Sequence, residues 1–213
     1  MGKGHTRRPM HKVHVIQPLI PRYRLPLFRQ LGAAEDWRFT VSASRRLPWV
    51  TNLASEELPE SWADLEHPAR RVPGTPFVWQ GGMALPPGFG PGDVLVLFSE
   101  VRYLSNYPLL MAARRRGSGI VAWGHGFGKR GGLADRLRIA LVRRCDAVLL
   151  YSKAEIEAYA AMGFDQGCLF ATQNAIDQRP IRDARAKWDA PRLEAFRERQ
   201  GLAGRTLLLY CGR

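Results

Sequence analysis

The sequence feature that most constrains the fold is a set of short, continuously apolar runs that alternate with helical patterns. Three such runs follow one another at 93–98, 119–123 and 146–151. A strand of this kind is covered on both faces, as in the interior of a parallel sheet. The stretches between the runs, about 104–116 and 133–144, have the apolar spacing of helices. The pattern therefore predicts an α/β fold, a Rossmann-like parallel sheet with helices on both faces and right-handed crossovers.

The remaining elements of the first part of the chain have weaker patterns. A strand–helix–strand unit is expected at its start, with a strand at 13–17, a helix within 23–31 and a strand at 37–44. Residues 45–92 contain eight prolines, which interrupt any regular pattern. We expect only short strands there, near 70–72 and 77–80.

Residues 152–163 carry the start and stop signals of a helix. Ser152 and Glu155 have the spacing of a capping box, in which each side chain hydrogen-bonds the backbone N–H of the other residue. Gly163 tolerates positive φ, which suits the residue that ends a helix. We therefore expect a helix from Lys153 to Gly163, followed by a strand at 168–172.

The last part of the chain is charged and rich in arginine, with a short helix expected near 192–200. It ends in one more apolar run, 206–211, which has no partner strand in the pattern. We expect this run to open a second domain that these residues do not complete. The predicted organisation is a basic tail at 1–12, a Rossmann-like domain at 13–178, a linker at 179–204 and the first strand of another domain at 205–213.

The charge balance favours anionic partners. Lys and Arg number 32 against 19 Asp and Glu, which gives a net charge of +13, and 27 of the basic residues are arginine. A positive field attracts phosphorylated ligands, anionic membranes and nucleic acid. A codon bias toward arginine is the alternative explanation. The basic runs lack interleaved surface aromatics, so a nucleic-acid partner is not expected.

Cysteine usage and hydropathy predict the compartment. The three cysteines are widely separated and form no pair motif, which fits reduced thiols: Cys145, Cys168 and Cys211. The first twelve residues are basic and lead into the first strand without the apolar region of a signal peptide. No run approaches the roughly 18 apolar residues of a spanning helix. We expect a cytoplasmic protein, and any membrane contact at the inner face to be peripheral.

The chemistry of a parallel sheet lies in the loops that follow the carboxyl ends of its strands. The loop after the first strand, 18–24, has no glycine, which excludes a dinucleotide fingerprint. Its Arg22 and Arg24 either bind a phosphate or polar group bidentately or are solvated surface arginines. No spacing typical of a metal site, a nucleophile elbow or a Walker loop is present.

The segment Gly124-His125-Gly126 is the most informative local motif. It directly follows the apolar run 119–123, so His125 should stand at the carboxyl edge of the sheet with space on either side. Histidine titrates near neutrality and can donate or accept a proton. His125 is therefore a candidate catalytic or substrate-orienting residue, and a structural histidine is the alternative.

Several short motifs resemble those of one enzyme family. They are Ile20-Pro-Arg-Tyr-Arg-Leu-Pro-Leu-Phe28, Gly124-His125-Gly126, Tyr151-Ser152 with the helix to Gly163, Asn174-Ala-Ile-Asp177, and Tyr210-Cys-Gly-Arg213. In this order they resemble the family 4 glycosyltransferases, which are retaining enzymes of the GT-B fold with two Rossmann-like domains. Asn174-Ala-Ile-Asp177 is similar to the more usual Asn-Gly-Val-Asp. Tyr210-Cys-Gly-Arg213 is similar to the opening strand of the family's donor-binding domain.

The resemblance implies that 13–178 is the acceptor-binding domain and that 205–213 opens the donor-binding domain. It implies a transferase, active in polysaccharide biosynthesis, that moves a sugar with retention from a nucleotide sugar to a glycan, lipid-linked or small-molecule acceptor. The nucleotide sugar is a co-substrate, and neither a metal nor another cofactor is expected. His125 is the implied catalytic residue, and the implied substrate-binding residues are Arg22, Tyr23, Arg24, Gly124, Gly126, Ser152 and Asn174. The fragment alone should be inactive.

Two alternatives remain open. The chain could be a non-catalytic basic α/β module that binds a nucleotide, an anionic lipid or nucleic acid. The predicted helix at 133–144 also carries an apolar stripe, Leu133, Leu137, Ala140 and Leu141, beside Arg136 and Arg143. We expect this stripe to cover the sheet, and contact with an anionic membrane is the alternative.

Overall fold

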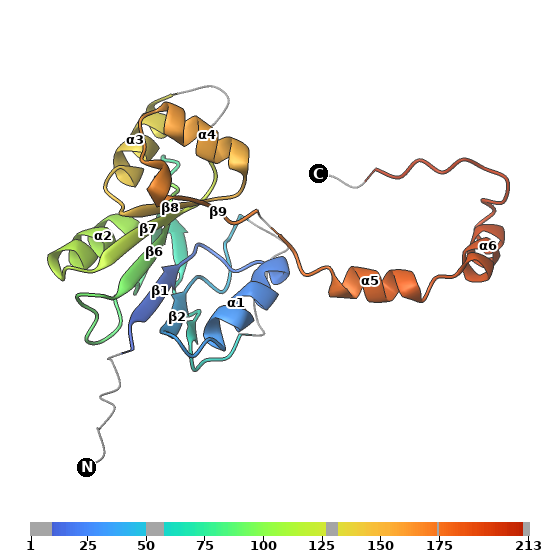
Figure 1. Ribbon diagram of the computed structural model, residues 1–213, viewed down its shortest axis with the longest axis horizontal. Helices are drawn as coiled ribbons and strands as arrows, with labels where there is room; N and C mark the ends of the chain where they lie inside the picture. The colour runs from blue at the N-terminus through green and yellow to red at the C-terminus, as the bar shows by residue number, and fades with distance from the viewer. Residues whose placement is uncertain (1–9, 50–57, 127–131, 174, 211–213) are drawn as a thin grey trace, which may run out of the picture. The chain divides into compact units, whose positions relative to one another are not determined.

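The computed structural model describes residues 10–49, 58–126, 132–173 and 175–210 (Figure 1). The chain divides into two compact units, residues 1–175 and 176–213. Each unit is described by itself.

The first unit is built on one parallel sheet of seven strands, in the order β3-β2-β1-β6-β7-β8-β9. The strands are β1 Lys12–Ile16, β2 Arg38–Ser42, β3 Ala63–Asp64, β6 Val94–Phe98, β7 Gly119–Trp123, β8 Ala147–Leu150 and β9 Leu169–Ala171. The predicted strands of this sheet are all present within a few residues of their expected bounds. Only the two-residue strand β3 was not expected.

Helices cover both faces of this sheet, as predicted. They are α1 Leu25–Gly32, α2 Asn106–Arg115, α3 Leu133–Val142 and α4 Lys153–Ala161. Figure 1 shows α1 on one side of the sheet and the other three on the opposite side. The alternation of side chains along β6 divides the core accordingly: Val96 packs in the cluster that contains Phe28 of α1, and Leu97 packs with Leu109 of α2. The α/β Rossmann-like architecture follows from strands that are apolar on both faces.

The proline-rich segment adds an antiparallel hairpin beside the carboxyl ends of the strands. Its strands, β4 Ala69–Arg71 and β5 Val78–Gln80, agree with the two short strands expected there. The N–H of Val78 donates to the carbonyl of Arg102, and the buried amide of Gln80 donates to the carbonyl of Pro18 at 3.1 Å and to Ser44 Oγ at 2.7 Å. The hairpin therefore ties together the loops that follow β1, β2 and β6.

The predicted capping box is confirmed in α4. Ser152 Oγ accepts a hydrogen bond from the N–H of Glu155 at 3.2 Å, and the carboxylate of Glu155 accepts the N–H of Ser152 at 2.9 Å. Gly163, just beyond the end of the helix, has φ +83°. A left-handed glycine at this place leaves no side chain to clash with the preceding carbonyl.

The apolar stripe of α3 was expected to cover the sheet, but its first two residues are exposed. Leu141 is buried, but Leu133 is 73% exposed and Leu137 is 44% exposed. Of this helix, the buried apolar clusters take Leu141 and Val142, while Asp135 and Arg138 of its first two turns have side chains only 16% and 11% exposed. The inward-facing side of these turns is therefore charged, and Leu133 and Leu137 lie on the outer side. Within the described residues, no helix is long and apolar enough to cross a membrane.

The second unit contains two helices, α5 Arg179–Ala186 and α6 Ala190–Arg199. Helix α6 matches the helix expected near 192–200, and α5 was not predicted. The strand expected at 206–211 is not formed over the described residues 206–210, where Leu208 is 93% exposed. A strand satisfies its backbone groups only beside another strand, and this unit has no other strand among its described residues.

Candidate functional site

The strand order marks one place on the sheet where a ligand is expected. Strand β1 lies between β2 and β6 in the sheet. The chain adds β2 and β3 on one side of β1 and then adds β6 to β9 on the other side, so the strand order reverses direction at β1. In open α/β sheets, ligands bind outside the carboxyl ends of the strands at such a switch point. The loops that follow β1, β7 and β8 bring aromatic and basic side chains to this edge.

Arg24 is the centre of a side-chain cluster at this edge. Its guanidinium carbon lies 4.9 Å from the ring centroid of Trp123, 5.2 Å from that of Tyr151 and 5.6 Å from that of Tyr23. The same group donates hydrogen bonds to Gln17 Oε1 at 3.3 Å and to the hydroxyl of Tyr151. We call Gln17, Tyr23, Arg24, Trp123 and Tyr151 the Arg24 cluster. Cation–π contacts and charge-assisted hydrogen bonds hold this arginine in one orientation.

Helix α1 fixes the position of Arg24. The residue precedes Leu25, the first residue of the helix, and Pro26 occupies a helix position where a missing N–H costs nothing. Phe28, one turn further on, is fully buried, and its ring centroid lies 6.1 Å from that of Trp123. The core contact of α1 therefore sets Arg24 against the end of β7.

His125 stands beside the same cluster. Its side chain is exposed, and its ring centroid lies 4.2 Å from that of Tyr151, with the ring planes at 53°. Gly124 before it is buried, and a Cβ atom there would lie 2.1 Å from Ser99 Oγ. The glycine lets the loop after β7 turn closely over the loop after β6, so the imidazole faces outward from the sheet edge.

Tyr151 can act as a proton donor at this place. Burial raises the pKa of its hydroxyl above the usual value, and the nearby Arg24 opposes that rise only in part. The hydroxyl therefore stays protonated at neutral pH. Because its oxygen accepts from Arg24, its own proton is available to an oxygen of a ligand.

Buried polar atoms without partners also collect on this side. Within the described part of the chain, four buried polar atoms on this side lack a hydrogen bond: Gln17 Nε2 and Trp123 Nε1 at the ends of β1 and β7, and Ser105 Oγ and Asn106 Oδ1 at the start of α2. Asn106 is held against the end of β6, since its amide donates to the carbonyl of Phe98 at 2.8 Å. An unpaired buried polar group costs about 1–3 kcal/mol. Such groups are retained where a ligand or ordered water supplies the missing partner.

The structure brings together most of the residues predicted for the site. Tyr23 and Arg24 are in the cluster, Gly124 and Gly126 flank His125, and Ser152 caps the helix that follows Tyr151. Arg22 is exposed on the 3-10 turn Arg22–Arg24 (η1), and the predicted Asn174 lies outside the described residues. Sequence reasoning missed the roles of Gln17, Trp123 and Tyr151. The available signal was their place at the ends of three predicted strands.

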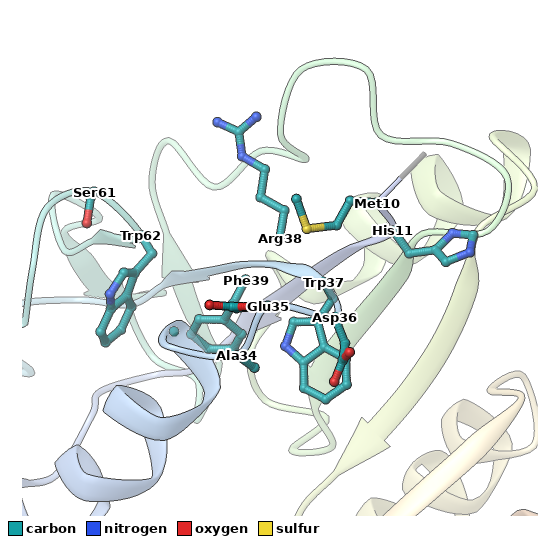
Figure 2. Close-up of a pocket in the computed structure, with 11 residues that line it drawn as sticks. Met10, His11, Ala34, Glu35, Asp36, Trp37, Arg38, Phe39, Ser61 and Trp62 are labelled. Atoms are coloured by element: carbon teal, nitrogen blue, oxygen red, sulfur yellow. The ribbon is translucent and has the colours of Figure 1, made fainter. Parts of the chain in front are cut away.

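A large depression elsewhere on the first unit is a different feature (Figure 2). It has a volume of about 940 Å³ and lies where β2 begins, at the opposite edge of the sheet. Its wall includes Trp37, Trp62, Glu35 and Arg38, and none of the residues predicted for the site. Gly32 allows the Trp62 indole to lie against α1, because a Cβ there would be 2.6 Å from the ring. We do not place the site here, since ligands of parallel sheets bind at the other edge.

Replacing Arg24 by Lys is expected to lower the free energy of unfolding by about 1–2 kcal/mol. Lysine keeps the charge but loses the planar group that stacks on the rings and reaches Gln17 and Tyr151 together. Urea denaturation followed by circular dichroism measures the loss. The matched control is Arg22→Lys, because Arg22 lies two residues away on the same turn and is exposed. Equal losses in both variants would contradict the special role of Arg24.

Comparisons with known proteins add no assignment to this geometry. No protein-family model, no curated protein and no solved structure matches the chain. Among the described residues, no three His, Cys, Asp or Glu side chains are grouped so that they could hold a metal ion.

Proposed function

We propose that residues 13–178 form the acceptor-binding domain of a retaining nucleotide-sugar glycosyltransferase of the GT-B type. The observation that carries the proposal is the placement of His125. An exposed imidazole stands at the carboxyl edge of a Rossmann-like sheet, between two buried glycines and 4.2 Å from the ring of Tyr151. The ordered resemblance of the motifs to family 4 glycosyltransferases points to the same chemistry.

The cluster suggests a division of roles. His125 orients the reacting centre, or stabilises it by a hydrogen bond to a sugar hydroxyl. The hydroxyl of Tyr151 donates to an oxygen of the acceptor or of the transferred sugar, while Arg24 holds that hydroxyl in place. A second domain closing over this edge would exclude water and bring donor and acceptor into reacting geometry.

The proposed donor is a nucleotide sugar, used as a co-substrate without a metal or another cofactor. The proposed acceptor is a glycan, a lipid-linked sugar or a small molecule. The proposed location is the cytoplasm. The runner-up, a basic module that only binds its ligand, predicts binding at the same edge without turnover.

Incubation of the full-length protein with UDP-, GDP- and ADP-hexoses and a pool of oligosaccharide and lipid-linked acceptors tests the proposal. We expect a glycosylated product whose anomeric proton, read by NMR, has the configuration of the donor. The 213-residue chain alone should show no turnover. Binding of a nucleotide sugar without any transfer would favour the module, and turnover by the isolated chain would contradict the two-domain mechanism.

The exposed first turn of α3 supports a second binding partner besides the proposed sugar substrates. Leu133 and Leu137 are one turn apart and exposed, and Arg136 lies between them in the sequence. Apolar side chains beside arginine suit the interface of an anionic membrane. We propose that the protein contacts such a membrane peripherally through this turn.

Replacing both Leu133 and Leu137 by Ser is expected to weaken binding to anionic vesicles about tenfold, because less apolar surface enters the bilayer. Co-sedimentation with phosphatidylglycerol vesicles measures the binding. Met111→Ser on α2, where Met111 is 46% exposed, is the control and should bind as the unaltered chain does. Binding of the unaltered chain that does not depend on anionic lipid would refute the membrane proposal.

A further inference from the structure

Glu155 makes more hydrogen bonds than the capping of its helix requires. Its Oε2 accepts the N–H of Ser152 at 2.9 Å, which is the capping bond, and also the N–H of Tyr151 at 2.8 Å. Its Oε1 accepts the N–H of Gly126 at 2.6 Å, from a loop 29 residues earlier in the chain. One carboxylate therefore holds the backbone on either side of the paired His125 and Tyr151 rings.

Gly126 is held from its other side as well. Its carbonyl accepts a hydrogen bond from Arg138 Nη1 at 3.1 Å. Arg138 in turn contacts Asp135 at 3.1 Å and Glu100, from the loop after β6, at 3.1 Å. The residue that follows His125 thus has both its N–H and its carbonyl fixed by partly buried charged groups from α3 and α4.

The close contact also explains why the second flanking residue is glycine. A Cβ atom on Gly126 would lie 3.0 Å from Glu155 Cγ and 3.2 Å from Oε1. Both distances are shorter than ordinary van der Waals contact, so a side chain there would displace the carboxylate. The absence of a side chain at Gly126 therefore leaves room for the carboxylate of Glu155.

We propose that Glu155 is a positioning residue, whose carboxylate fixes the backbone of Gly126 against Tyr151 and so sets where the His125 imidazole stands. Glu155 itself does not contact the reacting atoms. The geometric part of this inference stands on the hydrogen bonds alone, and its consequence for catalysis rests on the proposed glycosyltransferase function.

The ionised form of Glu155 is the one that fits this role. Burial opposes ionisation, but hydrogen bonds from the N–H groups of Gly126, Tyr151 and Ser152 outweigh it and lower the pKa of this carboxyl below its usual value. A group whose pKa is lowered by folding stabilises the folded state above its unfolded pKa. That contribution is lost as the pH falls through the lowered pKa of the folded state.

NMR of the isotope-labelled chain tests the positioning directly. Glu155→Gln has one acceptor oxygen in place of two, so either the N–H of Gly126 or those of Tyr151 and Ser152 lose their partner. The hydrogen-exchange rate of the freed N–H groups should rise at least about tenfold. The substitution should also move the His125 ring protons, which lie near the Tyr151 ring, toward the shifts of an unstructured histidine. Glu157→Gln makes the same charge change at an exposed position of α4 and should leave both signals unchanged. Unchanged His125 ring shifts together with unchanged exchange at Gly126, Tyr151 and Ser152 in folded Glu155→Gln would overturn the proposal.

A second variant separates positioning from helix capping. Ser152→Ala removes the capping hydroxyl and weakens α4, but it leaves the bond between Gly126 and Glu155 in place. We expect it to lower the melting temperature without changing the His125 ring shifts. A His125 shift as large as that of Glu155→Gln would show that capping alone explains the effect, and would overturn the proposal.

If Glu155→Gln does not fold, acid titration of the unaltered chain gives the decision. The amide proton of Gly126 must then shift as Glu155 protonates, and a constant shift would refute the contact.

In the full-length protein, we expect Glu155→Gln to lower kcat about tenfold with little change in KM, and Glu157→Gln to keep full activity. Absence of transfer in every version, with the NMR effects present, would reject the proposed function and leave the positioning intact.

Discussion

Replacing His125 by Ala is expected to lower kcat/KM for the proposed sugar transfer by the proposed two-domain protein by about 100- to 10,000-fold, the range that positioned acid–base and hydrogen-bonding groups contribute. The side chain is exposed and lies beside Tyr151, so its loss removes a functional group without opening the core. Initial rates at several acceptor concentrations, with the melting temperature recorded in parallel, give the measurement.

The matched control is His11→Ala. His11 is also an exposed histidine of the first unit, but it precedes β1 at the opposite edge of the sheet. Its replacement should leave kcat/KM of the proposed transfer within about twofold of that of the unaltered protein, because His11 contacts no part of the Arg24 cluster in the described structure. Undiminished transfer by His125→Ala would remove the imidazole from the mechanism.

Replacing Phe28 by Ala is expected to lower the free energy of unfolding by about 3–5 kcal/mol, the usual cost of removing a buried aromatic ring. Phe28 is fully buried, with its ring centroid 6.1 Å from those of Phe39 and Trp123. The cavity would open directly beneath the residue on which Arg24 stacks. We therefore expect weaker near-ultraviolet circular dichroism from the tryptophans as well as a lower urea midpoint.

Phe170→Ala provides the control for this loss. Phe170 lies on the edge strand β9 and is 51% exposed, so less of its ring is removed from a packed environment. We expect it to cost about 1 kcal/mol or less. A loss as large as that of Phe28→Ala would show that ring removal anywhere in the sheet is equally harmful, contrary to the burial argument.

The pattern of residues close in sequence was enough to predict most of the fold. The apolar runs that became β6, β7 and β8 are read within windows of five or six residues, and a strand covered on both faces leaves few sheet types possible. The capping box of Ser152 and Glu155 is equally local, since its partners are three residues apart. The strand expected at 206–211 is not formed over the described residues 206–210. A strand needs a neighbouring strand, and local sequence patterning does not show whether one is present.

The site was predictable only in part. A glycine-flanked histidine after a buried strand must stand at the carboxyl edge, and His125 does. The partner of Arg24 could not be read from the sequence, because Tyr151 lies 127 residues away and reaches it across the sheet. The exposed leucines of α3 were likewise undecidable from periodicity, which shows that a helix has an apolar face but not what covers it.

By itself, the sequence determined a parallel α/β sheet and the loops in which its chemistry should lie, because strand and helix periodicities are short-range properties of the chain. Only the tertiary structure decided which side chains meet at that edge. The strand order sets the end of β1 and the loops after β7 and β8 along one edge. The packing of Phe28 then sets the orientation in which Arg24 reaches Trp123 and Tyr151. These contacts join residues far apart in the chain, so their geometry exists only once the sheet has assembled.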